Sequence, residues 1–448
     1  MNRARNASAG QEEPVRGRVI GIGGRNGGGA DRSGPRVCLL TETYHPVVGG
    51  GETQARTLSR GLSERLAPVL VLTRRSSVEL GRIEQRKKVM VRRGPPAGRG
   101  QLFKWCFLPT SFFMLLRWRR DYDVVYVSGF RMLGIAAIIA GLLTGRPTIL
   151  KADSLGEMSG EFFRAGLRAI GLAPTSFGVR HLIALRNRLF GRSSAFVAIS
   201  SAVETELIEA GVPPAKIRRI PNSVDVRRFQ AVAPEHRALL RSRLGWDERS
   251  PVAVYTGRLV SYKGLPGLVS AWADVRTAIP SARLVLVGGE GLDMHACGDR
   301  VAEIVERSGI RDAVELTGDV SDVSPYLQAA DLFVFPSERE AFGISLIEAM
   351  ACGLASATST AGGLADIVAD GRDGLTFPPG DIAAMVDAIV ALLGDEELRR
   401  KIGAEARKSA RLRFSEQAVV DETANLIHEV FGRSVSSPRP DLAPGGPS

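Results

Sequence analysis

The sequence predicts an α/β protein made of two Rossmann-like domains, each built on a doubly wound parallel sheet. Three observations lead to this expectation. The chain has 448 residues, which is too long for one hydrophobic core. Short apolar runs alternate with helical patterns, as they do where helices join the strands of a parallel sheet. The alternation restarts after residue 245, beyond a highly charged stretch at residues 226–250.

The first domain is expected at residues 36–230. Its strands are predicted at residues 36–41, 69–73, 124–128 and 148–151. A glycine loop at residues 49–51 precedes a helix that begins near Glu52. The apolar stretch at residues 132–143 is too short to span a bilayer, so we expect a buried helix there.

The second domain is expected at residues 245–413. Its strands are predicted at residues 252–256, 284–288, 314–317 and 332–335. A further helix is predicted at residues 414–432. Residues 1–35 are rich in Gly and Arg and lack the apolar segment of a secretory signal, so we expect a disordered tail. Residues 433–448, rich in Pro and Ser, are expected to form a second such tail.

The composition is that of an ordinary soluble globular protein, with 44% hydrophobic and 24% charged residues. The cysteines are far apart and include no Cys-x-x-Cys pair, so neither a disulfide framework nor a zinc site is indicated. They are Cys38, Cys106, Cys297 and Cys352. This pattern favours a protein of the reducing cytoplasm.

Charge is divided unevenly along the chain. Residues 1–244 carry a net charge of +22 and residues 245–448 a net charge of −11. A basic half can attract anionic lipid headgroups, phosphorylated acceptors or nucleic acid. No helix-turn-helix, RNP-like or zinc-finger pattern accompanies the charge, which disfavours nucleic acid. A general preference for arginine is the alternative, although it does not explain why one half alone is basic.

Two glutamates, Glu340 and Glu348, bracket the most informative stretch of the chain. The apolar run at residues 332–335 predicts a buried strand, and a helical pattern follows from about Phe342. A helix that begins directly after a parallel strand presents free N–H groups at the carboxyl edge of the sheet, where phosphate binds readily. Glu340 lies before this helix and Glu348 two turns into it. The alternative is a solvated acid at Glu340 and an acid on the face of a helix at Glu348.

The motifs around these glutamates resemble the retaining glycosyltransferases of family 4. Glu-x7-Glu at residues 340–348 is followed by Ala-Cys-Gly-Leu-Ala at residues 351–355 and by Gly-Gly-Leu-Ala-Asp at residues 362–366. Upstream lie Gly-Arg-Leu and Lys-Gly at residues 257–264, and Asn-Ser-Val-Asp at residues 222–225, where the family usually has Asn-Gly-Val-Asp. The resemblance covers roughly residues 36–430 and is most specific in its second half.

The resemblance implies a GT-B architecture, in which the two domains face a cleft and a nucleotide-diphosphate sugar binds mainly to the second. The helix at residues 414–432 would cross back to the first domain. Arg258 and Lys263 would stabilise the leaving diphosphate, a role that a metal fills in other enzymes. Glu340 would hold the sugar hydroxyls and Glu348 the ribose. The predicted donor-binding residues are Gly49, Gly50, Arg258, Lys263, Glu340, Phe342, Gly343, Ile344, Ser345 and Glu348.

The first domain departs from the family at the end of its strand at residues 148–151. Many members have a histidine there, whereas this chain has Asp153, with Glu157 four residues later. Asp153 is therefore predicted to contact the transferred sugar, and the alternative is that it caps the following turn. His45, beside the glycine loop, is either a site residue or a structural one.

Two further segments admit more than one interpretation. Asp121 and Asp123 form the Asp-x-Asp of the chain, but they precede a strand, which favours a solvated turn over a metal site. Aromatic and basic residues alternate at residues 101–120, as they do at a lipid headgroup boundary. A helix packed on the sheet would look similar.

The sequence therefore predicts a retaining glycosyltransferase that needs no metal and no cofactor other than its donor. The acceptor is expected to be a lipid-linked molecule, a glycan or a small molecule, and an anionic membrane surface is an expected partner. The protein would work in the cytoplasm or at the inner face of the membrane. The alternatives are a nucleotide-sugar epimerase of the same fold and a non-catalytic, membrane-associated relative.

Overall fold

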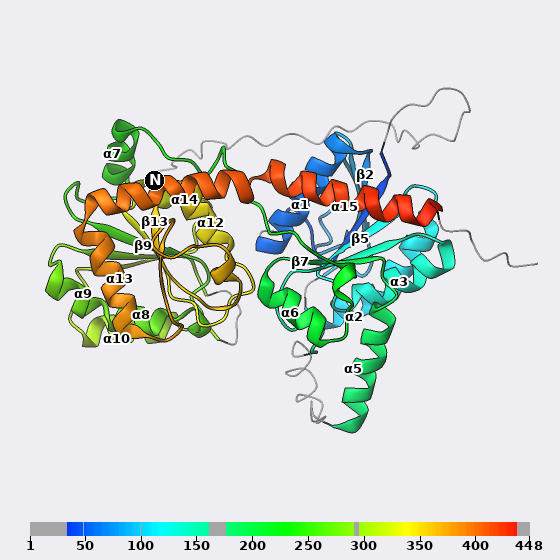
Figure 1. Cartoon of the computed structure of the whole chain (residues 1–448), viewed down its shortest axis with the longest axis horizontal. Coiled ribbons are helices and arrows are strands. Elements are labelled where there is room, and N and C mark those ends of the chain that lie inside the picture. Colours follow the sequence, from blue (N-terminus) through cyan, green and yellow to red (C-terminus); the bar gives the residue numbers. More distant parts are fainter. Residues whose placement is uncertain (1–33, 48, 99, 161–175, 291–294, 437–448) are drawn as a thin grey trace, which may run out of the picture. The chain divides into compact units, whose positions relative to one another are not determined.

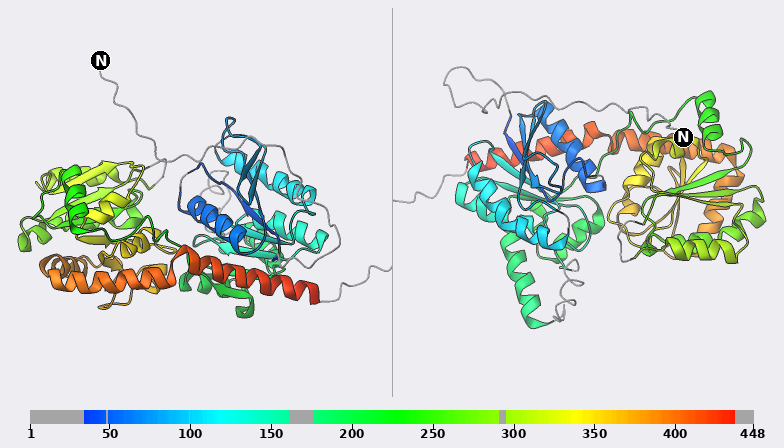
Figure 2. Two further views of the ribbon diagram at one scale, coloured as in Figure 1. Left: turned by 90° about the horizontal axis from the view of Figure 1, so that it is seen from above. Right: turned by 180° about the vertical axis from the view of Figure 1, so that it is seen from behind.

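A computed structural model describes residues 34–47, 49–98, 100–160, 176–290 and 295–436, with the side chains of residues 101 and 102 left aside. Most of the two predicted tails, residues 1–33 and 437–448, lies outside the described residues. The described chain forms two sheets with helices on both sides (Figures 1 and 2). The predicted class, two Rossmann-like α/β domains, is confirmed.

The first sheet has eight strands in the order β3-β4-β2-β1-β5-β6-β7-β8. They are β1 (Val37–Thr41), β2 (Val69–Arg74), β3 (Ile83–Arg86), β4 (Val89–Gly94), β5 (Val124–Ser128), β6 (Thr148–Ala152), β7 (Ala195–Ala198) and β8 (Ile217–Arg219). The central strands β1, β2 and β5 are parallel and buried along their whole length, which accounts for their continuous apolar runs. Strand β3 pairs antiparallel with β4 at the edge.

The helices of this part of the chain connect the parallel strands. They are α1 (Gly50–Arg65), α2 (Gln101–Arg117), α3 (Leu133–Thr144), α5 (Phe177–Phe190) and α6 (Ser201–Glu209), with a short turn η2 (Pro214–Lys216) before β8. In α2, which contacts α3, Phe107 and Leu115 are fully buried, whereas Trp105 and Phe113 remain exposed. The segment is thus a packed helix that also displays aromatic side chains.

The second sheet has six strands in the order β11-β10-β9-β12-β13-β14. They are β9 (Val252–Thr256), β10 (Arg283–Val287), β11 (Val314–Gly318), β12 (Leu332–Phe335), β13 (Ala355–Ser359) and β14 (Leu375–Phe377). All the pairings along this sheet are parallel. The aromatic rings of Tyr255 and Phe335 stack in its core, 5.8 Å apart.

The remaining helices surround the second sheet or follow it. They are α7 (Pro234–Arg243), η3 (Ser261–Lys263), α8 (Leu265–Ser270), α9 (Trp272–Ala278), α10 (Gly298–Arg307), α11 (Ser324–Ala329), α12 (Ile344–Ala351), η4 (Gly362–Asp366), α13 (Ile382–Gly394), α14 (Glu396–Arg413) and α15 (Glu416–Ser436).

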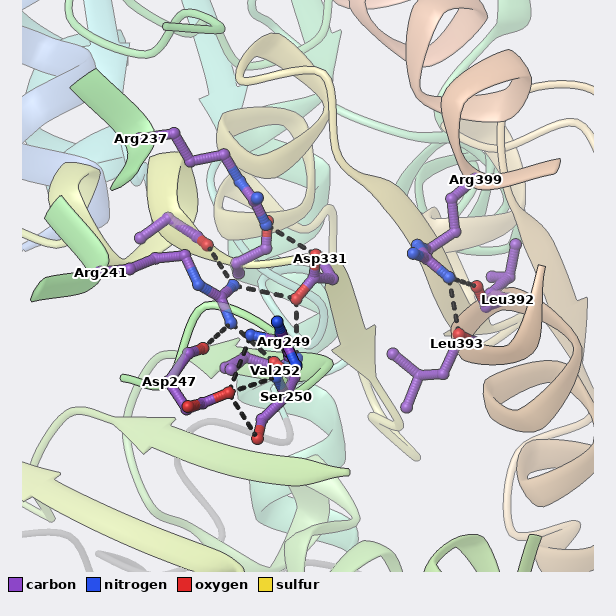
Figure 3. Close-up of polar contacts among 12 residues, drawn as sticks. Arg237, Arg241, Asp247, Arg249, Ser250, Val252, Asp331, Leu392, Leu393 and Arg399 are labelled. Carbon is purple, nitrogen blue, oxygen red and sulfur yellow. Dashed lines mark hydrogen bonds and ion pairs between the residues drawn. The ribbon is translucent and has the colours of Figure 1, made fainter. Parts of the chain in front are cut away.

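The charged stretch before the second domain forms a buried polar network (Figure 3). Asp331, just before β12, accepts the backbone N–H of Val252 at 2.8 Å and the guanidinium groups of Arg237 at 2.6 Å and Arg241 at 3.0 Å. Arg241 is 2% exposed and also donates to the carbonyl of Ser250 at 2.6 Å. These charged residues therefore connect helix α7 to the starts of strands β9 and β12.

The chain divides into two compact units. Within the described ranges, one comprises Met1–Leu150, Arg188–Ala195 and Ala424–Ser448, and the other Lys151–Asn187 and Phe196–Thr423. The last helix, α15, begins in the second unit and belongs to the first from Ala424 onward. In the described part of the chain, no helix has the length and apolar character that crossing a bilayer requires.

The Asp-x-Asp turn corrects one sequence-based interpretation. Asp121 and Asp123 precede β5 as expected, but Asp123 is not a solvated turn residue. Its carboxylate accepts from Arg36 at 2.9 and 3.0 Å and from Arg146 at 3.0 Å. Burial would raise the pKa of Asp123, but the hydrogen bonds and charge of Arg36 outweigh it and hold the pKa below its ordinary value. Asp123 therefore has a structural partner.

Candidate functional site

The six-stranded sheet contains a point at which its winding direction reverses. Strand β9 lies between β10 and β12, so the chain proceeds to one side from β9 and to the other from β12. At such a point, the loops at the carboxyl ends of the strands diverge and leave room for a ligand. Arg258 and Lys263 follow β9, and Glu340 follows β12. The structure therefore places these three predicted residues at the switch point.

Lys263 and Glu340 form an ion pair at this edge, with Nζ donating to Oε2. Each side chain is 14% exposed, so the pair is largely removed from bulk water. The second oxygen of Glu340 accepts the backbone N–H of Ala341 at 3.1 Å. Nζ of Lys263 also lies 5.1 Å from the centre of the Phe335 ring. A cation and a carboxylate thus neutralise each other at the switch point of the sheet.

Arg258 is exposed beside this pair and donates from Nη2 to the hydroxyl of Tyr262 at 3.0 Å. The carbonyl of Tyr262 accepts the backbone N–H of Glu338 at 2.9 Å, which joins the loop after β9 to the loop after β12. Tyr262 was not singled out from the sequence, because an aromatic residue before a motif lysine has no distinctive spacing. It orients Arg258 and ties the two loops together.

Two glycines allow these loops to approach closely. Gly264 has φ 73° and Gly362 has φ 54°, a backbone conformation that favours glycine. A β-carbon at Gly264 would collide with the carbonyl oxygen of Pro336, and one at Gly362 with that of Glu340. The glycines of the motif therefore pack the loops after β9 and β13 against the loop that carries Glu340.

Helix α12 begins at Ile344, two residues later than predicted. Its N-cap is Gly343, with φ 117°, and no side chain caps its first N–H groups. Ile344 and Ser345 are partly exposed there, so their N–H groups can reach a ligand. Phe342 is only 3% exposed and packs edge-on against Phe414, with ring centres 5.8 Å apart. Its side chain holds the loop in place, which leaves only its backbone for a ligand.

Glu348 lies in the second turn of α12 and is half-buried. Burial raises the pKa of its carboxyl to about 7, the nearby Arg228 lowers it, and Asp322 raises it further. Near neutral pH, the carboxyl is therefore present in both its protonated and its charged form. A ligand whose hydroxyls donate to this group would favour its charged form.

The loop that departs from the family follows β6. Lys151, whose side chain is 7% exposed, donates from Nζ to the carboxylate of Asp153 and to the amide oxygen of Asn222 at 3.0 Å. The Asp153 side chain is 21% exposed, so part of it remains accessible. Asn222 belongs to the Asn-Ser-Val-Asp motif, and two predicted segments therefore meet here.

Two glutamates hold the backbone of this loop. Glu157 accepts the backbone N–H of Asp153 at 3.0 Å, so its carboxylate caps the start of the loop. Glu206, from α6, accepts the backbone N–H groups of Gly156 at 2.7 Å and of Met158 at 2.9 Å. The sequence analysis missed Glu206, because it lies about 50 residues away and has no motif around it. A charge-assisted network thus fixes the loop.

The glycine loop of the first domain leads directly into α1. Gly49 is the N-cap of this helix and Gly50 its first residue. The carboxylate of Glu52 lies against Gly49 and accepts from the hydroxyl of Thr43. Burial, together with the charges of Arg56 and Arg86, lowers the pKa of His45. An uncharged imidazole therefore borders the loop at neutral pH.

Solved structures share the fold of this chain. Sucrose-phosphate synthase from Thermosynechococcus elongatus matches with a TM-score of 0.73 at 23% identity, over 89% of this chain and 100% of that one. HepE of Anabaena, in complex with UDP-glucose, matches with a TM-score of 0.69 at 22% identity, over 88% and 100%. The fold is the GT-B fold of glycosyltransferases.

Two family models then match successive parts of the chain. The model described as Glycosyltransferase Family 4 matches residues 48–228, and the model described as Glycosyl transferases group 1 matches residues 236–409. The chain belongs to the family 4 type of glycosyltransferases.

Curated relatives agree with this assignment at moderate identity. N-acetyl-alpha-D-glucosaminyl L-malate synthase of Bacillus anthracis is 28% identical over 240 residues, and the putative glycosyltransferase EpsD of Bacillus subtilis 35% identical over 203. These matches span 61% and 52% of the relatives' own lengths. D-inositol 3-phosphate glycosyltransferase of Xylanimonas cellulosilytica is 28% identical over 90% of this chain and 97% of its own length.

Proposed function

We propose that this protein is a retaining glycosyltransferase that moves a sugar from a nucleotide-diphosphate sugar to an acceptor hydroxyl without a metal ion. The observation that carries the proposal is the ion pair of Lys263 and Glu340 at the switch point of the second sheet, with Arg258 beside it. Cations there suit a diphosphate, and a carboxylate suits sugar hydroxyls.

The diphosphate would bind to Lys263, Arg258 and the first N–H groups of α12. Phosphate oxygens would then compete with Glu340 for Lys263, since both anions need the same Nζ. The freed carboxylate of Glu340 would accept hydrogen bonds from the sugar, and Glu348 would accept them from the ribose. Two fixed cations and a helix N-terminus can carry the charge that develops on the leaving group.

The donor base is proposed from similar structures. HepE has been solved with UDP and with UDP-glucose, and the catalytic domain of starch synthase IV from Arabidopsis thaliana with ADP. We therefore propose a UDP- or ADP-sugar as donor. Asp153 is proposed to contact the transferred sugar from the first domain, and Gly49 and Gly50 to contact the donor.

The reaction would proceed on one face of the sugar. The bond between the anomeric carbon and the phosphate oxygen breaks, and the acceptor oxygen bonds to the same carbon from the same side. The acceptor proton passes to an oxygen of the departing diphosphate, so the leaving group itself is the base. NMR of the product tests this step, since the anomeric configuration should match that of the donor.

The acceptor is proposed to be a lipid-linked molecule, a glycan or a small molecule at the cytoplasmic face of a membrane. The support is the basic first half of the chain, together with aromatic side chains that α2 exposes. The similarity to D-inositol 3-phosphate glycosyltransferase favours a small phosphorylated acceptor. The structural similarity to WaaG, a glycosyltransferase involved in lipopolysaccharide biosynthesis, favours a membrane glycan.

Thermal-shift measurements with UDP-, ADP- and GDP-sugars test the donor assignment. One nucleotide class should raise the melting temperature in the wild type, and the increase should shrink in Lys263→Ala. Incubation of that donor with candidate acceptors should then give a glycosylated product. Conversion of the donor into an isomeric or free sugar, without transfer to any acceptor, would favour the epimerase instead.

A further inference from the structure

The first compact unit contains an open cavity of about 480 Å³ at the end of the aromatic and basic segment at residues 101–120. Its lining consists of Leu116, Arg119, Arg120, Leu143, Thr144 and Arg146. Helices α2 and α3 end at this cavity, and strands β5 and β6 begin shortly after them. It therefore lies at the amino ends of these strands, opposite to the carboxyl edge that carries Asp153.

The arginines that line the cavity exceed the acids near it. Arg146 donates to Asp123 at 3.0 Å, but Asp123 also serves Arg36 at 2.9 Å. The guanidinium group of Arg119 donates to the carbonyl of Leu116 at 3.1 Å. Arg120 is exposed. Asp121, directly after Arg120, is a second acid of this region. Two carboxylates thus stand against the guanidinium groups of Arg36, Arg119, Arg120 and Arg146, which leaves net positive charge around an open volume.

Capping of helix ends explains only part of this arrangement. Cations commonly neutralise the carbonyls at a helix C-terminus, as Arg119 does for α2. A cap needs neither a cavity nor further arginines on its other sides. Three arginines in the lining of one open volume are instead suited to phosphate, which guanidinium groups bind in a bidentate manner.

Large apolar side chains surround the same region. On α3, which contains no charged residue, Ile139, Leu142 and Leu143 are 38%, 57% and 68% exposed. They recur at a spacing of three or four residues and so share one face of the helix. On α2, Phe113 is 65% exposed and lies three residues before Leu116, a residue of the lining. Exposed apolar side chains beside a basic pocket match the boundary between headgroups and acyl chains.

We propose that this cavity, the arginine pocket, binds the phosphate of an anionic membrane lipid while the exposed side chains of α2 and α3 enter the acyl boundary. Charge complementarity selects an anionic lipid, and the leucines select a bilayer over free phosphate. This proposal rests on the membrane-proximal acceptor proposed above. Binding to vesicles can nevertheless be measured without any sugar transfer. Each arginine near an anionic surface contributes roughly a fivefold factor in affinity, at about 1 kcal/mol per charge.

Vesicle co-sedimentation of the full chain tests the proposal. The wild type should bind vesicles of phosphatidylcholine with phosphatidylglycerol, should not bind phosphatidylcholine alone, and should dissociate as salt rises. The double variant Arg119→Ser/Arg120→Ser should bind roughly 25-fold more weakly. A second double variant, Leu142→Ser/Leu143→Ser, should also lose binding although its charge is unchanged.

A matched control removes the same charge elsewhere. Arg307 and Arg311 have side chains that are each 79% exposed at the end of α10 and just beyond it, so Arg307→Ser/Arg311→Ser should bind vesicles as the wild type does. If both double arginine variants lose vesicle binding equally, net charge explains the effect and the proposed role of the arginine pocket is wrong.

Two further outcomes separate this proposal from the proposed function. If the wild type stays in the supernatant with anionic vesicles at low salt, the membrane proposal is wrong. If the wild type does not bind vesicles, but inorganic phosphate raises its melting temperature and not that of Arg119→Ser/Arg120→Ser, the pocket binds free phosphate instead. Nucleotide sugars should stabilise Arg119→Ser/Arg120→Ser as much as they stabilise the wild type. The membrane proposal can therefore be wrong while the proposed donor site is right.

Discussion

The loops after β9 and β12 and the loop after β6 carry charged residues in the same kind of place, yet they are built differently. In the second sheet, Lys263 and Glu340 pair with each other, and glycines pack their loops together. After β6, Asp153 pairs with Lys151, and the loop is held by Glu206 and Asn222, which come from later segments. The partners are about equally distant in the sequence, since 77 residues separate Lys263 from Glu340 and 71 separate Lys151 from Asn222. The candidate site after β9 and β12 could be predicted because both of its charged residues lie in recognised motifs, whereas Glu206 lies in none.

Removal of Lys263 should have the largest effect. Lys263→Ala removes a partly desolvated cation from the proposed leaving group and strands the carboxylate of Glu340, so kcat should fall by about 100-fold, or roughly 3 kcal/mol. Arg258→Ala should also lower it sharply. Lys408→Ala, an exposed lysine on α14, is the matched control. Activity within twofold of the wild type in both site variants would remove these cations from the mechanism.

The loop after β6 should show strong coupling between its charges. Asp153→Ala leaves the buried ammonium of Lys151 without its carboxylate and should destabilise the fold by about 3 kcal/mol in denaturant unfolding. Lys151→Met together with Asp153→Ala should recover most of this loss, because no charge is then left unpaired.

The rate of sugar transfer should show whether Asp153 contacts the sugar or only supports the fold. The double variant restores stability but still lacks the proposed sugar contact, so its kcat/KM should remain low. Activity that returns together with stability would show that Asp153 only supports the fold.

Glu348 should make stability depend on pH. The folded protein holds this proton until about pH 7, whereas the unfolded chain releases it near 4.5, so stability falls as pH rises between these values. Glu348→Gln should therefore stabilise the protein by about 3 kcal/mol above pH 7 and have no effect below 4.5. The melting temperature measured across this range provides the test.

The same carboxyl should couple nucleotide binding to pH. If the ribose hydroxyls donate to the charged form, UDP or ADP should bind the wild type more tightly as pH rises from 6 to 8, roughly the range of its titration. Binding to Glu348→Gln should be weaker and independent of pH in this range. A wild-type affinity that stays flat would place the ribose elsewhere.

Chelation should have the smallest effect. Lys263, Arg258 and the first turn of α12 are proposed to carry the charge of the diphosphate, so EDTA should leave the transfer rate unchanged. Loss of transfer in EDTA, with recovery on adding manganese or magnesium, would contradict the proposed mechanism.

Sequence patterns predicted the fold class and the strands with continuous apolar runs, because burial on both faces leaves a clear signal. Six strands were not predicted, namely β3, β4, β7, β8, β13 and β14. Strand β3 has no buried residue, β8 and β14 have three residues each, and β13, although buried, consists of Ala, Ser and Thr. The ion pair of Lys263 and Glu340 joins two recognisable motifs, but its existence could not be read from their spacing. Asp123 shows the same limit, because its partners Arg36 and Arg146 are 87 and 23 residues away.

The ion pair of Lys263 and Glu340 also has a consequence for selectivity. An anion that takes Lys263 leaves Glu340 without its counterion, and a half-buried carboxylate without a partner is costly. A nucleotide sugar provides hydroxyls for that carboxylate, whereas inorganic phosphate or a bare nucleotide provides none. Under the proposed function, the ion pair would therefore favour a ligand that carries both a diphosphate and sugar hydroxyls. After sugar transfer, Glu340 would pair with Lys263 again, which would favour release of the nucleotide.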